Sequence, residues 1–298
     1  MDIIQALQGL APALNELMFF ITNLGSERAY IIFLLIAYLA IDARVGRLLG
    51  VALLSSFYLN FMLKGIIDTP RPFVLEPSLS LGEQYDATGI GAGFPSGHAQ
   101  ASTTFWGLAA VFVRRSWFWL LAIIIIVLIS ISRMYFALHL PIDIIGGIVI
   151  GIGVILLALW VFRTAEGASS NKGLIIGLGI LVPFIIHLIV PNVVSIPESD
   201  LLMGGLAAFI TGPAIYKHVV AGKLWQRGLL ALIGIVLAFV FLIGSSLVLP
   251  EEVKRNALGG FIRYLALGYV GVLLTPWLGR ALRLVPHTVP RATLKTHA

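Results

Sequence analysis

The stretch IDIIGGIVIGIGVILLALWVF, Ile142 to Phe162, is apolar except for one charged residue. A helix rises about 1.5 Å per residue, so a helix of this length crosses the roughly 30 Å hydrocarbon core of a bilayer. The rest of the chain has the same character: 59% of its 298 residues are hydrophobic, 11% are charged and the mean hydropathy is +0.99. Water-soluble domains carry about 25% charged residues. The chain is therefore predicted to lie embedded in a bilayer.

Further apolar runs of the same kind predict a bundle of spanning helices. In chain order the expected spans are Ala29–Ile41, Leu48–Leu63, Ala99–Val113, Trp117–Ile131, Ile142–Phe162, Gly173–Val190, Leu201–Tyr216, Leu229–Leu249 and Ala257–Leu278. The opening segment, Ile3 to Ile21, contains several polar residues and either spans or lies in the interface. We expect an all-α membrane protein: a six-helix core that begins with this segment, then four additional C-terminal transmembrane helices. The expected division is residues 1–165 and residues 172–298.

The basic residues predict the orientation of the chain. Threading the nine spans alternately places thirteen of the twenty Lys and Arg residues on one side, which marks the cytoplasm. They are Arg44, Arg47, Arg114, Arg115, Arg163, Lys172, Lys217, Lys223, Arg227, Arg280, Arg283, Arg291 and Lys295. The net charge of +6 is thus spread over short clusters, and nucleic acid is not an expected partner. The chain has no cysteine, which excludes disulfides and thiolate metal sites.

Three polar stretches interrupt the apolar chain, and each lies at an expected helix end on the outer side. They are KGIIDTPRP (Lys64–Pro72), FPSGHAQ (Phe94–Gln100) and SRMYFALHLPID (Ser132–Asp143). Charges at the membrane edge are costly unless they are paired or functional. Three such stretches at one depth therefore predict a single shared ligand.

The cations and the PSGH motif favour a phosphate as that ligand. Arg71 and Arg133 can each hold two phosphate oxygens, and Lys64 adds a point charge. Ser96 and Gly97 at a helix start provide a hydroxyl and backbone N–H groups, and the helix dipole favours negative charge there. The predicted site is a cradle for a dianionic phosphoryl group.

Two histidines and an aspartate add chemistry to this cradle. His139 and Asp143 are four residues apart, so if a helix begins near Leu138 they share a face, and the carboxylate can orient the imidazole. Such a pair makes an activated nucleophile. Spacing alone does not decide which of His98 and His139 attacks and which acts as an acid.

The patterns K-x6-RP, PSGH and SR-x5-H-x3-D occur here in this order. Together they resemble the type 2 phosphatidic acid phosphatases, a superfamily that also includes glucose-6-phosphatase and the vanadium haloperoxidases. Every signature position is matched. The resemblance covers Leu48 to about Phe162 and the two segments before it, but not Lys172 to Ala298.

The resemblance implies a metal-independent, two-step phosphoryl transfer without a cofactor. It makes His139 the nucleophile that forms a phosphohistidine, Asp143 the residue that holds its ring, and His98 the acid that protonates the leaving group. It also implies which residues bind the phosphate oxygens, namely Lys64, Arg71, Ser96, Gly97 and Arg133.

We therefore expect a lipid phosphate phosphatase of the plasma membrane, with several passes and an active site that faces the periplasm or exterior. The expected substrate is a lipid phosphomonoester or diphosphate, such as phosphatidic acid, phosphatidylglycerol phosphate, undecaprenyl diphosphate or a sphingoid phosphate. One alternative is a phosphotransferase that passes the phosphoryl group to a lipid or sugar hydroxyl. Another is a lipid transporter that uses the cradle only for binding. Residues 172–298 carry no second signature, and a dimerising or stabilising bundle is their default role.

Three further features carry weaker expectations. His187 has no partner motif and is expected to be a structural residue of the bundle. Tyr135 is expected to lie in the aromatic belt at the membrane interface. The loop from Phe73 to Phe94 is either a lid over the site or a solvated connector.

Overall fold

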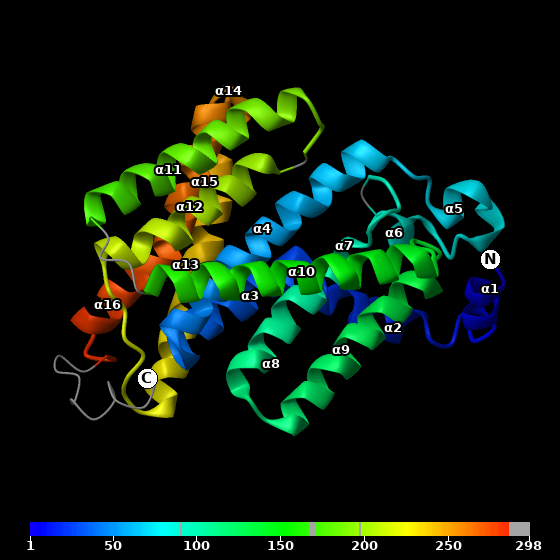
Figure 1. Cartoon of the computed structure of the whole chain (residues 1–298), viewed down its shortest axis with the longest axis horizontal. Coiled ribbons are helices and arrows are strands. Elements are labelled where there is room, and N and C mark those ends of the chain that lie inside the picture. Colours follow the sequence, from blue (N-terminus) through cyan, green and yellow to red (C-terminus); the bar gives the residue numbers. More distant parts are fainter. Residues whose placement is uncertain (90, 167–170, 197, 286–298) are drawn as a thin grey trace. The chain divides into compact units, whose positions relative to one another are not determined.

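The computed structural model describes residues 1–89, 91–166, 171–196 and 198–285, and every regular element in these ranges is a helix (Figure 1). The all-α prediction is confirmed. In chain order the elements are α1 Asp2–Gln8, α2 Asn15–Leu24, α3 Glu27–Ile36, η1 Ala37–Ile41, α4 Ala43–Ile67, α5 Pro72–Leu75, η2 Pro77–Leu79, α6 Glu83–Asp86, α7 Gly97–Ser102, η3 Thr103–Gly107, α8 Leu108–Val113, α9 Ser116–Tyr135, α10 Pro141–Glu166, α11 Lys172–Ile189, η4 Val190–Asn192, α12 Ser199–Ile215, α13 Leu224–Val248, α14 Glu251–Arg255, α15 Ala257–Tyr269, η5 Val270–Leu274 and α16 Thr275–Ala281. Arg291 and Lys295, assigned above to the cytoplasmic side, lie outside the described residues.

The chain is a multi-pass membrane protein, with fewer full-length spans than the sequence predicts. Within the described ranges six helices are long and apolar enough to cross a membrane, and a bent pair, Asn15–Leu24 with Glu27–Ile41, makes a seventh if it counts as one span. The six are Ala43–Leu75, Ser116–Tyr135, Pro141–Thr164, Lys172–Asn192, Leu224–Val248 and Ala257–Ala281. The expected spans Ala99–Val113 and Leu201–Tyr216 are also helical, but they are not among these six.

The opening segment, Ile3 to Ile21, is not a single helix. The helix α1 ends at Gln8, and α2 begins only at Asn15. Pro12 lies between them, and proline cannot continue the hydrogen-bonding pattern of a helix. A bend of 51° then separates α2 from the helix that follows it. The first helix of the predicted core is therefore a broken element.

The polar residues of this segment bond to the chain around the end of α9. Gln8 donates hydrogen bonds from Nε2 to the carbonyl oxygens of Leu79, at 2.8 Å, and Tyr135, at 2.9 Å. The Tyr135 hydroxyl donates to Asn15 Oδ1 at 2.6 Å, and the Tyr135 side chain is only 1% exposed. Tyr135 is thus a core residue, and its assignment to an aromatic belt is wrong.

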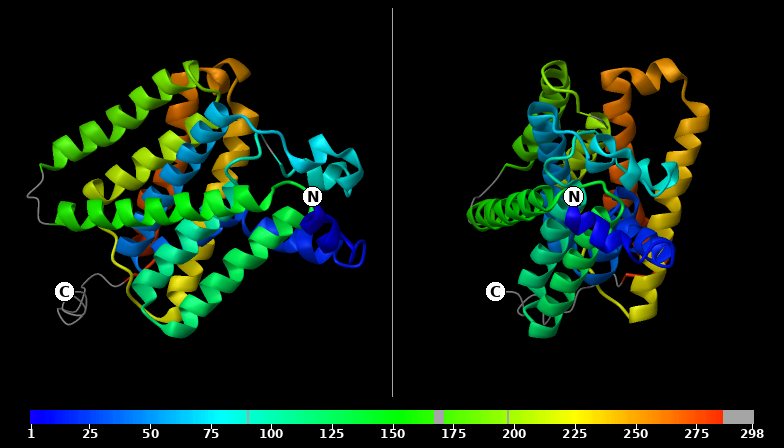
Figure 2. Two further views of the ribbon diagram at one scale, coloured as in Figure 1. Left: turned by 45° about the vertical axis from the view of Figure 1, so that its right-hand side comes forward. Right: turned by 90° about the vertical axis from the view of Figure 1, so that its right-hand side faces the viewer.

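The chain forms two compact units that interleave along the sequence. The first unit comprises Met1–Tyr30, Ala52–Ala168 and Val190–Pro197, and the second comprises Ile31–Val51, Ser169–Ile189 and Glu198–Ala298. In the first unit α8 and α9 form a helical hairpin (Figure 2). Arg114 ends α8 with a left-handed backbone (φ 54°), which allows the chain to reverse. The division at residues 165 and 172 stays a prediction.

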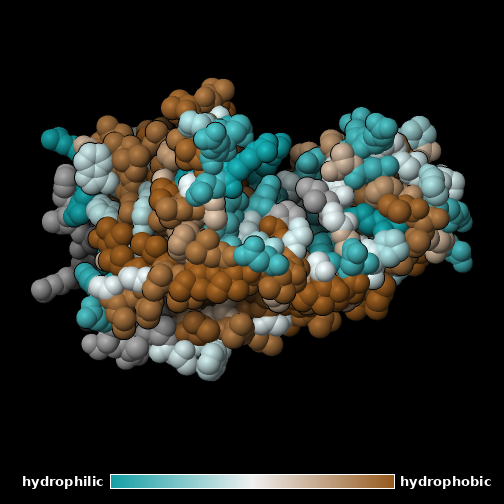
Figure 3. All heavy atoms as spheres, turned by 90° about the horizontal axis from the view of Figure 1, so that it is seen from above, coloured by the Kyte–Doolittle hydropathy of each residue, from teal (hydrophilic) through white to brown (hydrophobic). Residues whose placement is uncertain are grey.

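The start of α10 packs closely against the start of α7. A Cβ atom added to Gly147 would lie 2.5 Å from the carbonyl oxygen of Ser96, so this approach requires glycine. The other face of α10 carries Ile145, Val149 and Leu156, which are 56%, 61% and 63% exposed. Apolar surface of this kind is extensive in the space-filling view (Figure 3). The structure thus joins two of the three motifs on the inner face of a lipid-facing helix.

Candidate functional site

All eight predicted site residues lie at helix ends of the first unit. Lys64 is in the last turn of α4, Arg71 precedes α5, Ser96 is the N-cap of α7, Gly97 and His98 begin α7, Arg133 is in the last turn of α9, His139 lies between α9 and α10, and Asp143 is in the first turn of α10.

The three motifs meet through direct contacts. Arg71 Nη1 lies 3.2 Å from His139 Nε2 and donates a hydrogen bond to the carbonyl oxygen of Leu138 at 2.9 Å, which links the first motif to the third. The Ser96 N–H donates to the carbonyl oxygen of Asp143 at 3.0 Å, which links the second motif to the third. Residues that are up to 68 positions apart in the sequence therefore line one site.

The His139 ring has different partners on its two nitrogens. Nδ1 lies 3.6 Å from Asp143 Oδ2, and this oxygen accepts a hydrogen bond from the Leu140 N–H at 2.8 Å. Nε2 faces Arg71. The carboxylate therefore favours a proton on Nδ1 and leaves the lone pair of Nε2 directed toward the cation.

His139 and Asp143 reach this arrangement without sharing a helix face. The helix α10 begins at Pro141, later than the start near Leu138 on which the expectation depended. Ala137 takes a left-handed backbone (φ 51°), so the chain turns just before His139. The approach of ring and carboxylate is thus a property of this turn.

The surroundings of His139 keep its imidazole neutral. The side chain is 1% exposed, and this burial lowers the pKa of His139 well below its ordinary value. The positive charges of Arg71, Arg133 and Lys64 lower the pKa further. A neutral imidazole retains the lone pair that a nucleophile needs.

The loop after α5 contributes oxygen atoms to two of the cations. Lys64 Nζ donates to the carbonyl oxygens of Ala92 and, at 3.4 Å, Gly93. Arg71 Nε donates to the carbonyl oxygen of Gly91 at 2.9 Å. The Phe73 to Phe94 loop therefore lines the site, which a merely solvated connector would not do.

Arg133 is held by two threonines that the sequence did not indicate. Its Nη1 donates to Thr22 Oγ1 at 2.9 Å and Thr88 Oγ1 at 3.0 Å, and its Nη2 donates to the Thr88 carbonyl oxygen at 3.0 Å. The Arg133 side chain is only 1% exposed. Thr22 lies 111 positions away on α2, where no motif points to it.

Another histidine, His187, belongs to the second unit. Nδ1 of His187 lies 3.0 Å from Ser199 Oγ, and its Nε2 lies 3.1 Å from the carbonyl oxygen of Ala257, so His187 is a satisfied bundle residue, as expected. The described part of the chain has no group of three or more His, Cys, Asp or Glu residues arranged to hold a metal ion.

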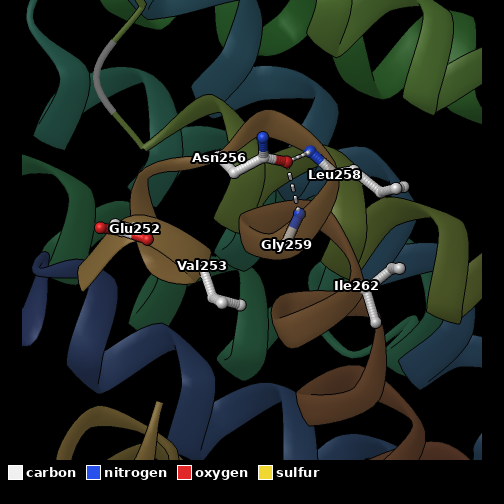
Figure 4. A pocket seen from close by; sticks show the side chains of 6 residues that line it. All are labelled: Glu252, Val253, Asn256, Leu258, Gly259 and Ile262. Atoms are coloured by element: carbon white, nitrogen blue, oxygen red, sulfur yellow. Dashed lines mark hydrogen bonds between the residues drawn. The ribbon is translucent and has the colours of Figure 1, made fainter. Parts of the chain in front are cut away.

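A pocket in the second unit contains none of the predicted site residues (Figure 4). It is lined by Glu252, Val253, Asn256, Leu258, Gly259 and Ile262. Asn256 Oδ1 accepts hydrogen bonds there from the N–H groups of Leu258, at 3.0 Å, and Gly259, at 3.3 Å, and so caps α15.

Comparison with known proteins extends the resemblance beyond the three motifs. The model of the PAP2 superfamily matches residues 46–166, and the model described as PAP2 superfamily phosphatase, transmembrane extension, matches residues 201–287. The second match corrects, for residues 201–287, the expectation that the resemblance does not extend to Lys172–Ala298. No solved structure matches the chain.

The similar proteins include an undecaprenyl-diphosphatase of Sulfolobus acidocaldarius, 33% identical over 143 residues, which are 46% of this chain and 66% of that protein. Sphingosine-1-phosphate phosphatase 2 of Mus musculus is 30% identical over 173 residues, which are 56% of this chain and 48% of that protein. The chain thus spans less than two thirds of the length of either relative. Because both family models match and the three motifs meet in one site, the chain belongs to the PAP2 superfamily.

Proposed function

We propose that this chain hydrolyses a lipid phosphomonoester or diphosphate through a phosphohistidine on His139. The observation that carries the proposal is the environment of the His139 ring. Its Nε2 lies 3.2 Å from Arg71 Nη1, while Asp143 lies on the Nδ1 side. Nε2 accepts a hydrogen bond from Arg71 Nη1 here, and a phosphoryl group that takes over this donor stands next to Nε2 and leaves its lone pair available for attack.

In the first step, His139 Nε2 attacks phosphorus, and the bond from phosphorus to the leaving oxygen breaks. Burial and the three cations lower the pKa of His98, and the bound phosphoryl dianion offsets the charge of those cations. His98 is then protonated and gives its proton to the leaving oxygen, so the lipid product leaves as an alcohol or as a lipid monophosphate. Lys64, Arg71 and Arg133 offset the negative charge on the other phosphoryl oxygens. Asp143 stabilises the positive charge that the attacking imidazole gains.

In the second step, water attacks phosphorus, and the bond between phosphorus and His139 Nε2 breaks. His98 lost its proton in the first step, so it is now a base and takes a proton from the attacking water. Inorganic phosphate leaves, and both histidines return to their starting state. The resemblance supplies the roles of His98 and His139, and the two-sided environment of His139 supports the role of His139.

The relatives support a lipid substrate. One is named for undecaprenyl diphosphate and the other for sphingosine-1-phosphate, and both compounds belong to the expected class. The cations of the site recognise a phosphoryl group and not the rest of the lipid. Phosphatidic acid, phosphatidylglycerol phosphate, undecaprenyl diphosphate and a sphingoid phosphate are therefore the substrates to compare.

The test is a panel of these four lipids with the purified chain in detergent micelles. We expect release of inorganic phosphate from at least one lipid, with the same rate in excess EDTA. Activity lost in EDTA would contradict the metal-independent mechanism. Transfer of the phosphoryl group to an added alcohol without phosphate release would indicate a phosphotransferase. Lipid binding without turnover by the intact site would indicate a transporter.

We also propose that the site faces the exterior of the plasma membrane, as the distribution of basic residues indicates. The absence of cysteine allows a matched test with Ser78→Cys, in the loop that lines the site, and Ser116→Cys, at the start of α9; both serines are exposed. In intact cells a membrane-impermeant maleimide should label the first variant and reach the second only after permeabilisation. The reverse pattern would invert the orientation. Association of two copies through the C-terminal segment stays a prediction.

A further inference from the structure

Four buried polar residues of the first unit form a network beside the PSGH turn. They are Ser56 and Asn60 on α4, Gln100 on α7 and Thr104 on η3, and their side chains are 0% to 3% exposed. Ser56, Asn60 and Lys64 follow each other at intervals of four residues and so share one face of α4. The network therefore continues inward from the phosphate-binding lysine.

The hydrogen bonds of the network have a single consistent direction. Asn60 Nδ2 donates to Gln100 Oε1 at 2.9 Å, and Gln100 Nε2 donates to Ser56 Oγ at 3.0 Å. Thr104 Oγ1 donates to the carbonyl oxygen of Gln100 at 2.9 Å. The remaining bond, 3.0 Å between Ser56 Oγ and Thr104 Oγ1, then uses the Ser56 proton. Loss of one member therefore disturbs the next.

The network ends on the backbone of the phosphate-binding turn. The second hydrogen of Asn60 Nδ2 goes to the carbonyl oxygen of Pro95 at 3.2 Å. A Cβ atom added to Gly97 would lie 3.0 Å from Asn60 Oδ1, so Asn60 lies against this turn. The same peptide group contains the Pro95 carbonyl and the Ser96 N–H, and this N–H donates to the carbonyl oxygen of Asp143. Asn60 thus touches the point from which α7 begins.

The N–H groups of Gly97 and His98 belong to the first turn of α7, where a helix supplies no internal partner. The direction of these two N–H groups depends on the orientation of the Pro95–Ser96 peptide before them. A second contact holds the same turn: Thr69 Oγ1 accepts a hydrogen bond from the Phe94 N–H at 2.7 Å. Thr69, in the first motif, and Asn60, on α4, therefore hold this turn from two sides.

We propose that Asn60, Gln100, Ser56 and Thr104 are positioning residues, which hold the turn of Pro95 to His98 in register with Lys64 for phosphoryl transfer. The proposal rests on the proposed function. Its alternative is that the network only holds helices together, as buried polar residues do in many membrane proteins. The two explanations differ in what a loss of the network changes: transition-state geometry, or only stability.

Thr104 and its neighbour Thr103 provide a matched comparison. Both are buried, but Thr103 Oγ1 donates only to Ala99 O of its own helix, at 2.7 Å, among the hydrogen bonds of the described chain. Thr104→Val removes the acceptor of the Ser56 hydroxyl with almost no change of shape. Thr104→Ser keeps the hydroxyl. Asn60→Leu removes the anchor of the Pro95 carbonyl outright.

The experiment measures kcat and KM for phosphate release from the best lipid of the panel, with the full chain in detergent. We expect Asn60→Leu to lower kcat roughly 100-fold and Thr104→Val roughly tenfold, because small displacements of positioned groups are costly in rate. KM should change by no more than about threefold, since ground-state lipid binding stays in place. Thr104→Ser and Thr103→Val should retain the wild-type kcat.

Orthovanadate, which binds as a five-coordinate analogue of the phosphoryl-transfer transition state, provides a readout that needs no turnover. Its stabilisation of the melting temperature should shrink in Asn60→Leu and Thr104→Val and persist in Thr103→Val. A wild-type chain that binds orthovanadate without hydrolysing lipids would contradict the proposed function, while the melting shifts would still decide the role of the network. The positioning role would be overturned if Thr103→Val and Thr104→Val lost kcat equally. It would also be overturned if Asn60→Leu and Thr104→Val lowered the melting temperature but left kcat unchanged. A wild-type chain that neither hydrolyses the lipids nor binds orthovanadate would overturn both the proposed function and the positioning role.

Discussion

His139→Ala should reduce phosphate release by about 10⁴-fold or more, since removal of a covalent nucleophile leaves only the contribution of binding and charge. The residue is buried, its Nδ1 lies against Asp143, and its Nε2 faces Arg71. Alanine removes the attacking atom and leaves the three cations in place. Binding of the lipid phosphate, measured by its protection against thermal unfolding, should therefore persist.

The matched control is His187→Ala in the second unit. His187 is also a buried histidine, hydrogen-bonded to Ser199 and Ala257. This variant should lose stability and keep kcat per folded molecule. In addition, brief reaction and alkaline quenching should trap phosphohistidine in the wild type and in His187→Ala, but not in His139→Ala. Undiminished turnover of His139→Ala would end the proposed mechanism.

Arg71→Lys should lower kcat/KM by about 10² to 10³-fold, although the charge is conserved. One guanidinium reaches the Gly91 carbonyl oxygen through Nε, and the Leu138 carbonyl oxygen and His139 through Nη1. An ammonium group cannot make these contacts in one plane while also holding a phosphoryl oxygen. Loss of one donor to the transition state has an effect of this size in other enzymes.

Arg47→Lys is the control for this substitution. Arg47 also lies on α4 and donates to the carbonyl oxygen of Ile210 at 3.3 Å within the second unit. This variant should retain the wild-type kcat/KM, measured as phosphate release at subsaturating lipid. If Arg71→Lys and Arg47→Lys show the same small effect, the guanidinium fork has no part in catalysis.

The sequence was sufficient for the fold class and for the residues of the motifs. Long apolar runs predict helices because the bilayer leaves the backbone no other way to satisfy its polar groups. The motif residues were recognisable because charges at the helix ends of an apolar chain are costly unless they are paired or functional. The meeting of Arg71 with His139, and of Ser96 with Asp143, follows from that reasoning, and the contacts are present.

The supporting residues were not predictable in the same way. Thr22 contacts Arg133 from 111 positions away, and Asn60 contacts Gln100 from 40 positions away. A single threonine or asparagine in an apolar helix is compatible with many partners, and only the packing of the helices selects one. The same limit applies to Tyr135, whose ring is equally suited to an interface and to a core.

The first segment is not one helix, for a local reason. The polar residues Gln8 and Asn15 lower the hydropathy of this segment. Their side chains form hydrogen bonds with Leu79 and Tyr135, so the segment is shaped by these contacts and does not form one long spanning helix. Hydropathy measures the solvent that a segment prefers. It contains no information on such pairings, which accompany the break at Pro12 between α1 and α2.

The backbone oxygens around Lys64 and Arg71 have a consequence for turnover. These cations donate hydrogen bonds to the carbonyl oxygens of Gly91, Ala92 and Gly93. Inorganic phosphate, the common end product of the proposed reaction, gains only the difference between its own contacts and those it replaces. Because these carbonyl oxygens compete with phosphate for the same donors, we expect inorganic phosphate to be a weak inhibitor of the proposed reaction.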